Sequence, residues 1–229
     1  MIKAVAFDIG ETLIDDTREW GAWADWIGIP RHTFSAVVGA LVASGRGNRE
    51  TFHVFRPGFD VAAERVARER AGCGQLVEEA DLYPDVRPAL ASLRQRGFWV
   101  VIAGNQSAQV GQCLRDLRLP ADVIATSEEW GVGKPDRAFF KNVVDACHAT
   151  ADEILYVGDH RDYDITAGRV AGLHTALIRR GPWGHLWWDD PTNRANADVA
   201  VTTLLELTEW LSTQHERARR VRGYGRRSV

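Results

Sequence analysis

The sequence has little cysteine and no long apolar run, and both features limit the classes of protein to which it can belong. Its three cysteines, Cys73, Cys113 and Cys147, lie far apart. A disulfide framework and a zinc site are therefore not expected, and a reducing cytoplasm is the natural compartment. No apolar run approaches the roughly 20 residues that span a bilayer, and the first residues lack the pattern of a secretory leader. We therefore expect a cytoplasmic protein without a membrane partner.

Lysine is scarce, and neither sign of charge dominates. Only three of the 28 basic residues are lysine, and the formal net charge of −3 gives no general attraction to nucleic acid. Hydrophobic residues at 45% and charged residues at 26% exclude a disordered chain. The length of 229 residues fits one large domain, or a core with an insert. The arginine-rich tail, residues 215–229, is expected to be frayed and solvated.

Short apolar runs alternate with helical patterns along most of the chain. Continuous apolar strands separated by helices are typical of a parallel sheet with helices on both faces. We therefore predict an α/β fold, a Rossmann-like doubly wound parallel sheet. The predicted strands are residues 2–7, 98–103, 123–126, 154–157 and 175–178, and the predicted helices are residues 84–96, 107–118, 136–148 and 203–214.

Residues 14–82 interrupt this alternation with a mostly helical pattern. Because the strand at residues 2–7 must join the later strands in one sheet, we interpret this segment as a helical cap inserted into the core. The predicted core domain is residues 1–13 and 83–229, and the predicted cap domain is residues 14–82. Within the cap, helices are expected at residues 18–27, 32–43 and 59–71, with an interruption at residues 44–50.

Acidic side chains follow two of the predicted strands. Asp8 follows the first strand, Asp159 and Asp164 follow the strand at residues 154–157, and Lys134 lies in a loop. In a parallel α/β sheet, ligands bind outside the carboxyl ends of the strands. Carboxylates gathered there repel one another unless a cation neutralises them. Carboxylate oxygens are hard ligands that suit Mg²⁺, which keeps coordination positions free for phosphate oxygens. A carboxylate at the same place can also act as a covalent nucleophile.

These motifs, in this order, resemble those of the haloacid dehalogenase-like (HAD) hydrolases, in the subclass with a helical (C1-type) cap. The matching segments are residues 7–13, 133–136 and 158–159 with Asp164, and residues 82–86, where such caps rejoin the core. The resemblance covers nearly the whole chain. It implies a Mg²⁺-dependent phosphatase that acts on a small phosphorylated metabolite, as a monomer or homodimer.

The resemblance also implies a catalytic pair and a metal site. Asp8 would be the nucleophile that forms an aspartyl-phosphate, and Lys134 would steady both Asp8 and the phosphate. Asp8, Asp159 and the backbone carbonyl of Gly10 would bind Mg²⁺ directly. Asp164 would support the metal site without binding the ion itself.

A second group of residues is implied on the substrate side of the site. Lys134 and Asn105 would border the phosphate. Thr12, counted with them as a substrate-binding residue, would pack or hydrogen-bond within the first loop.

Two positions depart from the family pattern D-x-D-x-T and from its usual second motif. The second aspartate, which protonates the leaving group and then activates water, is replaced by Gly10. General acid–base catalysis contributes roughly 10²–10⁴-fold, so this loss matters. Gly104 takes the place of a hydroxyl residue, for which Ser107 is a candidate substitute. The candidates for the missing acid are Glu11, Asp15, Asp16, His160 and Asp162, among which His160 and Glu11 are preferred.

Two other functional classes stay open at this point. Gly10 and Gly104 are compatible with a weak or inactive HAD-fold protein that binds a phosphorylated ligand or a partner protein. A metal-independent 2-haloacid dehalogenase is the third hypothesis, because Arg18 and Arg31 could bind a carboxylate substrate, although the acids at 159 and 164 favour metal and phosphate. The predicted cap contains no lysine, which excludes a phosphonatase-like Schiff base.

Each candidate residue also has a purely structural interpretation. Asp8 could cap the turn after its strand, and Asp159 and Asp164 could be a turn residue and a helix N-cap. Lys134 could be a solvated surface residue, and Asn105 could merely stabilise a turn.

Tryptophan is concentrated in two places. Trp20, Trp23 and Trp26 recur at helical spacing, which predicts an apolar face packed within the cap, with a substrate-facing wall as the alternative. The aromatic segment at residues 181–188 fits either a pocket rim or a dimer contact.

Overall fold

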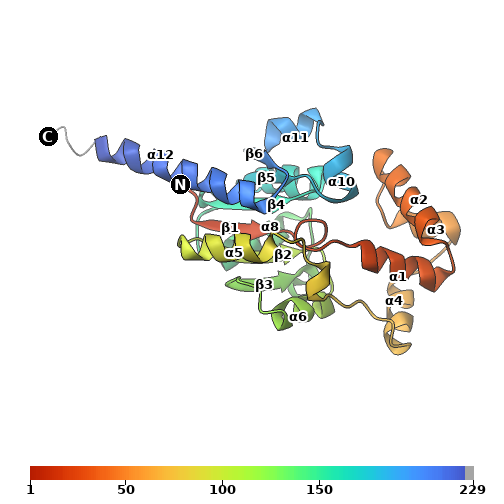
Figure 1. Cartoon of the computed structure of the whole chain (residues 1–229). Helices are drawn as coiled ribbons and strands as arrows, with labels where there is room; N and C mark the ends of the chain where they lie inside the picture. The colour runs from red at the N-terminus through yellow and green to blue at the C-terminus, as the bar shows by residue number, and fades with distance from the viewer. Residues whose placement is uncertain (225–229) are drawn as a thin grey trace.

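The structure, a computed structural model, describes residues 1–224, which contain six parallel strands in one sheet with helices on both faces (Figure 1). The strand order is β3-β2-β1-β4-β5-β6. This arrangement confirms the predicted doubly wound α/β fold. The strands are β1 (Ala4–Phe7), β2 (Trp99–Gly104), β3 (Val123–Thr126), β4 (Ile154–Gly158), β5 (His174–Ile178) and β6 (Val199–Val201).

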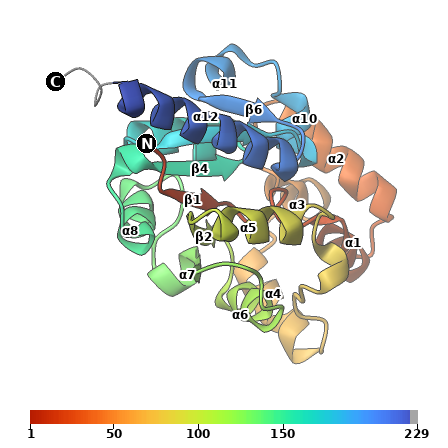
Figure 2. The same ribbon diagram turned by 60° about the vertical axis from the view of Figure 1, so that its left-hand side comes forward.

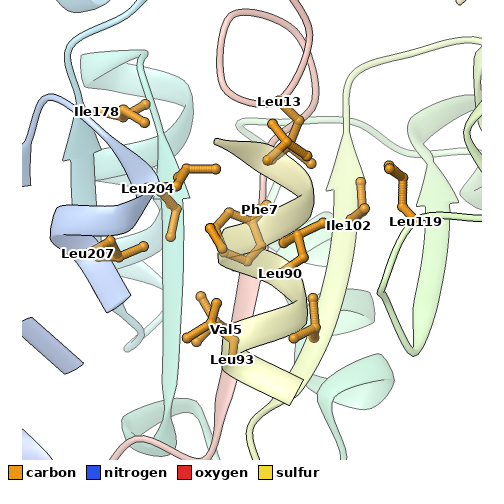
Figure 3. Packing of buried hydrophobic residues seen from close by; sticks show 14 of the residues in the cluster. Val5, Phe7, Leu13, Leu90, Leu93, Ile102, Leu119, Ile178, Leu204 and Leu207 are labelled. Atoms are coloured by element: carbon orange, nitrogen blue, oxygen red, sulfur yellow. The ribbon is translucent and has the colours of Figure 1, made fainter. Parts of the chain in front are cut away.

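Alternating side chains along the strands build a hydrophobic core on each face of the sheet. Val5 and Phe7 of β1 enter the larger core, together with side chains of α5, α6 and α12 (Figure 3). Ala4 and Ala6 enter the opposite core, which is covered by α8. The core helices are α5 (Val86–Gln95), α6 (Ala108–Asp116), α7 (Ser127–Trp130), α8 (Arg137–Cys147), α9 (Ala167–Val170), α10 (Gly181–Leu186), α11 (Pro191–Asn196) and α12 (Leu204–Tyr224).

Helix α12 differs from its prediction at the C-terminal end. It continues to Tyr224 and lies beside α5 on one face of the sheet (Figure 2). The prediction of a frayed tail from residue 215 is therefore wrong as far as Tyr224, and residues 225–229 lie outside the described part of the chain. Strand β6 was not predicted, because it has only three residues, and helices α10 and α11 were not predicted, because six residues are too few to show a helical period.

The inserted helices lie together beyond one end of the sheet, on the side opposite the N-terminus (Figure 1). They form a hydrophobic cluster that Trp183 of the core also joins, and in it Phe52 stacks on Phe59 with ring centroids 4.9 Å apart. The short α3 was not predicted, because it begins at the end of the segment interpreted as an interruption. The helices are α1 (Thr17–Ile27), α2 (Arg31–Ala43), α3 (Glu50–Phe55) and α4 (Val61–Arg70).

The two segments that connect the insertion to the core pair with each other. The Asp15 amide donates to the Asp81 carbonyl at 2.8 Å, and the Tyr83 amide donates to the Leu13 carbonyl at 3.1 Å. These bonds lie at the predicted boundaries of the cap. The division into two domains nevertheless stays a prediction.

A buried arginine that the sequence did not single out ties this junction to the end of β5. Arg180, just after β5, donates to the Thr12 carbonyl at 2.6 Å and to the Asp85 carboxylate at 2.6 Å. Its guanidinium also lies 4.2 Å from the centre of the Tyr83 ring. Arg180 thus connects the loop after β1, the residues at which the insertion rejoins the core, and the end of β5.

Two further findings concern the chain as a whole. In residues 1–224 no helix combines the length and the apolar character that crossing a membrane requires. All three cysteines are free thiols, as the sequence indicated.

Candidate active site

The nucleophile candidate and two further acids meet where β1 and β4 end. Phe7 of β1 is paired with Val157 of β4, so Asp8 and Asp159 leave the sheet from adjacent strands. Asp8, Asp159 and Asp164 are all buried, and each offers an oxygen atom within 4.8 Å of the others. The structure therefore brings together the three carboxylates that the sequence nominated.

Lys134 lies between two of these carboxylates. Its Nζ atom is 2.6 Å from Asp8 Oδ1 and 2.5 Å from Asp164 Oδ1. The other oxygen of Asp164 accepts a hydrogen bond from the His160 amide at 2.9 Å. Asp164 thus holds the lysine and the loop after β4, and a solvated surface position for Lys134 is excluded by its 7% exposure.

The pKa values show a surplus of negative charge at this edge. Burial raises the pKa of Asp8 to about 6, although Lys134 acts against the shift. Burial and the neighbouring charges of Asp164 and Asp8 raise the pKa of Asp159 well above its ordinary value. Burial alone would lower the pKa of Lys134, but the two carboxylates beside it raise that pKa.

The donor set fits a hard divalent cation. Asp159 Oδ2 is buried and has no hydrogen-bond partner among the described residues, which is unfavourable for a carboxylate oxygen. A cation bound beside Asp8 and Asp159 would neutralise both acids. Clustered carboxylate oxygens are the ligands that Mg²⁺ prefers in proteins.

Asn105 and Thr12 lie close to the site in different ways. The Asn105 side chain accepts from the Lys134 amide at 2.7 Å and donates to the Lys134 carbonyl at 2.9 Å, so it positions the lysine. Asn105 also lines the cavity described below. Thr12 is fully buried, and it is not among the residues that line the cavity. Substrate contacts by these two residues stay predictions.

The second departure from the family pattern has a steric explanation. A Cβ atom at Gly104, which ends β2, would overlap Asp8 Oδ1 and lie 3.1 Å from the Ile9 amide nitrogen. Asp8 therefore occupies the space that a serine at this position would need. Ser107 lines the cavity, and its Oγ accepts from the Val110 amide at 3.3 Å as the N-cap of α6. Its O–H remains able to donate, so a contact between Ser107 and phosphate stays a prediction.

A cavity of about 850 Å³ opens above these residues, between the core loops and the inserted helices. Trp20 and Trp23 line it and also contribute to the hydrophobic cluster of the insertion, so both interpretations of these tryptophans hold. Trp26 instead packs at the cluster and donates to Glu64 at 2.7 Å. Pro182 and Trp183 of α10 line the cavity from the core side, so the start of the aromatic segment lies at the pocket, and Trp187 packs against the hydrophobic cluster of the inserted helices.

Two arginines that kept the dehalogenase hypothesis open are engaged elsewhere. Arg18 forms an ion pair with Asp81, and Arg31 forms one with Asp25 at 2.6 Å. Neither arginine lines the cavity. The structure therefore gives no carboxylate-binding role to this pair.

The two preferred substitutes for the missing acid are also engaged. Glu11 accepts a hydrogen bond from the Tyr83 hydroxyl at 2.7 Å, and burial raises its pKa to about 7. His160 Nδ1 accepts from the Asp162 and Tyr163 amides, and burial lowers the pKa of His160 to about 4. Both residues line the cavity, yet neither lies where the side chain of residue 10 would point.

Comparison with known proteins agrees with this site. The family model described as haloacid dehalogenase-like hydrolase matches residues 2–172. The chain therefore belongs to the haloacid dehalogenase-like hydrolases and is an enzyme of that family, as its motifs predicted.

Among its curated relatives, phosphoglycolate phosphatase from Aliivibrio fischeri is 28% identical over 229 residues, covering 92% of this chain and 97% of its own. Ribulose-1,5-bisphosphate 5-phosphatase from Halopiger xanaduensis is 31% identical over 143 residues, or 59% of each chain. A solved haloacid dehalogenase-like hydrolase from Bacteroides fragilis has a TM-score of 0.67 at 21% identity, covering 90% of this chain and all of its own, and it shares the fold.

Proposed function

We propose that this enzyme is a Mg²⁺-dependent phosphatase that hydrolyses the phosphate ester of a small metabolite through an aspartyl-phosphate on Asp8. The observation that carries the proposal is the meeting of Asp8, Asp159, Asp164 and Lys134 at one edge of the sheet. The phosphatase names of the curated relatives support the same reaction class.

Each residue of the site has a task in this reaction. A carboxylate oxygen of Asp8 attacks phosphorus, the ester oxygen departs, and water later releases phosphate from Asp8. Lys134 holds Asp8 in place and faces the developing negative charge. Mg²⁺, held by Asp8, Asp159 and the Gly10 carbonyl, would neutralise charge on the transferring phosphoryl group.

The inserted helices act as a cap in this proposal. They supply Trp20, Trp23 and Phe52 to the wall of the cavity, opposite the carboxylates of the core. A cap that covers the site excludes water from the reaction and selects the substrate by the side chains it presents. The three free thiols fit a reducing cytoplasm, which we propose as the compartment, and we expect a monomer or homodimer.

A panel of phosphate esters, assayed with and without Mg²⁺, tests the proposal. We expect hydrolysis that requires the metal and that Asp8→Asn abolishes. Asp25→Asn, which changes an exposed acid outside the cavity lining, is the matched control and should keep its activity. Chloride release from 2-chloropropionate without metal, or Mg²⁺ binding without any turnover, would contradict the proposal.

A further inference from the structure

The space that a side chain at position 10 would need is already occupied by another carboxylate. A Cβ atom on Gly10 would lie 2.6 Å from Asp16 Oδ2 and 3.3 Å from Gln106 Nε2. Two non-bonded atoms do not normally approach as closely as the first of these distances. The region where the family pattern carries its second aspartate thus holds the carboxylate of Asp16.

The first loop explains how a residue six positions later reaches this place. The Leu13 and Ile14 amides both donate to the Ile9 carbonyl, at 2.9 and 3.0 Å, so the chain turns back on itself. Gly10 then bridges to Ile14, and the following residues run past the site. Asp16 lines the cavity together with Asp8 and Gly10.

The Asp16 carboxylate is available for chemistry. It precedes α1 but forms no side-chain capping bond, and no hydrogen bond from another side chain of residues 1–215 holds it. Glu11, by contrast, is bonded to Tyr83. His160 Nδ1 is occupied by two backbone amides.

We propose that Asp16 is the general acid–base of this enzyme and replaces the aspartate missing at position 10. This inference rests on the proposed function. As Asp8 Oδ bonds to phosphorus and the ester P–O bond breaks, the Asp16 carboxylic acid gives its proton to the leaving oxygen, and the alcohol departs. The Asp16 carboxylate then takes a proton from water as the water oxygen attacks phosphorus. Asp8 and protonated Asp16 are regenerated, and phosphate is released.

The Asp16→Asn variant tests this assignment with two substrates. An alkyl phosphate needs protonation of its leaving oxygen, so we expect kcat to fall by roughly 10²–10⁴-fold. Dinitrophenyl phosphate has a leaving group that needs no proton. The variant should therefore phosphorylate Asp8 rapidly with this substrate, hydrolyse the intermediate slowly, and accumulate phosphorylated Asp8 after a burst of dinitrophenolate.

Three further variants separate this role from a structural one. Asp15→Asn changes the adjacent acid, which is outside the cavity lining, and should keep wild-type rates on both substrates. Gly10→Ala should reproduce the Asp16→Asn defect, because its Cβ displaces the carboxylate. Combining Gly10→Asp with Asp16→Gly should restore much of the rate on the alkyl phosphate.

Equal loss on both substrates without phosphorylated Asp8, or full activity of Asp16→Asn on the alkyl phosphate, would overturn the assignment of Asp16. If the wild-type enzyme hydrolyses neither ester, the proposed function itself fails.

A separate observation concerns the cap side of the cavity. Arg49, which precedes α3, and Arg65 of α4 both line it. Neither forms an ion pair with the side chains that the structure describes, those of residues 1–215, whereas their neighbours Arg46 and Arg68 are paired with Glu50 and Glu19. Partial burial by the surrounding groups and the positive charge of Arg65 lower the pKa of Arg49, as expected for two guanidinium groups on the same wall of the cavity.

The geometry points to a second anion site formed by Arg49 and Arg65, which would bind a carboxylate or second phosphate of the substrate. This inference also rests on the proposed function. Guanidinium groups recognise both kinds of anion through paired N–H donors, and an anion between them would offset their repulsion. Their place on the insertion, opposite the carboxylates of the core, suits a substrate with one anionic group at each end.

Three phosphate monoesters test this site: one with a carboxylate, one with a second phosphate, and one of a neutral alcohol. We expect kcat/KM for one of the doubly anionic esters to exceed that of the neutral ester by at least about tenfold. Arg49→Gln and Arg65→Gln should remove this preference by raising KM for the doubly anionic ester much more than KM for the neutral ester. Arg70→Gln, on α4 but outside the cavity lining, is the matched control.

Equal kcat/KM for all three esters, or a preference that survives both cavity variants, would overturn the anion site and leave the phosphatase proposal standing. Absence of hydrolysis of all three would overturn the proposed function.

Discussion

Gly104 and Gly158 mark the two strand ends where a carboxylate packs against bare backbone. A Cβ atom at Gly104 would overlap Asp8 Oδ1, and one at Gly158 would overlap the Asp164 carboxylate. Lys134 needs both carboxylates in their present positions to bridge them. These two glycines therefore contribute to the active site because their missing side chains leave room for the two carboxylates.

Gly104→Ser would restore the hydroxyl of the usual second motif, but we expect it to lower activity. The new side chain must displace Asp8, and a shift of about 1 Å in a reacting group can reduce the rate by about 10²-fold. Steady-state kinetics of phosphate ester hydrolysis measure the effect. Gly39→Ala, where a Cβ meets no atom within 4 Å, serves as the control. Higher activity of Gly104→Ser would contradict the steric explanation.

The cysteines should differ sharply in reactivity. Burial raises the pKa of Cys147 to about 12, so almost no thiolate forms at neutral or mildly alkaline pH. Cys73 is exposed. Iodoacetamide followed by peptide mass spectrometry should therefore label Cys73 and spare Cys147 in the folded protein, and label both in urea. Rapid labelling of Cys147 under native conditions would contradict its burial at the C-terminal end of α8.

Sequence reasoning found the residues that follow strands and missed those that depend on loop geometry. Asp8, Asp159 and Lys134 were predictable because the carboxyl ends of parallel strands share one edge. Asp16 was only one of several candidates, since its position depends on the return of the first loop past Gly10. Arg180 gave no signal, because its three contacts come from distant parts of the chain.

At the scale of secondary structure elements, the junction between insertion and core depends on the buried ion pair of Arg180 with Asp85. Arg180 is 7% exposed, and Asp85 also accepts from the Leu204 amide at the start of α12 at 2.8 Å. The pair therefore connects the end of β5, the start of α5 and the start of α12. A change here affects several elements at once.

Arg180→Met should lower the free energy of unfolding by about 3 kcal/mol, because Asp85, whose side chain is only 12% exposed, would lose its counter-charge. Urea denaturation measures the change. Arg194→Met removes an ion pair with Asp189 whose side chains are 70% and 75% exposed, and should change stability by no more than about 1 kcal/mol. Equal effects of the two substitutions would contradict the role of the buried pair.

The main elements were predictable from periodicity, and the short ones were not. Helices such as α5 and α8 carry clear apolar faces and lie within two residues of their predicted bounds. Strand β6 has three residues, one of them exposed, so no pattern distinguishes it from a loop. The extension of α12 to Tyr224 was hidden because its arginine-rich sequence lacks an apolar face typical of a packed helix.

At the scale of the whole molecule, the crowded acids make stability depend on pH. The pKa of Asp8 is raised from 3.8 to about 6, and that of Glu11 from 4.5 to about 7. Between these values the folded state binds more protons than the unfolded state, so both groups lower stability as pH rises through that window. A bound cation beside Asp8 would oppose this effect.

We therefore expect metal-free wild-type protein to lose stability relative to Asp8→Asn between about pH 4 and pH 6, with a constant difference at higher pH. Urea denaturation in EDTA at several pH values gives the difference. Mg²⁺ should raise the Tm of the wild type more at pH 8 than at pH 5. A stability difference that is independent of pH would contradict the raised pKa of Asp8.

The covalent state of Asp8 during turnover is the most direct measure of the proposed chemistry. The enzyme would be mixed with an ester that it hydrolyses and Mg²⁺, quenched in acid within milliseconds, digested and analysed by mass spectrometry. We predict a phosphoryl group on Asp8 of the wild type, and its absence from Asp8→Asn. Efficient turnover with an unmodified Asp8 at every quench time, including in Asp16→Asn, would contradict the account.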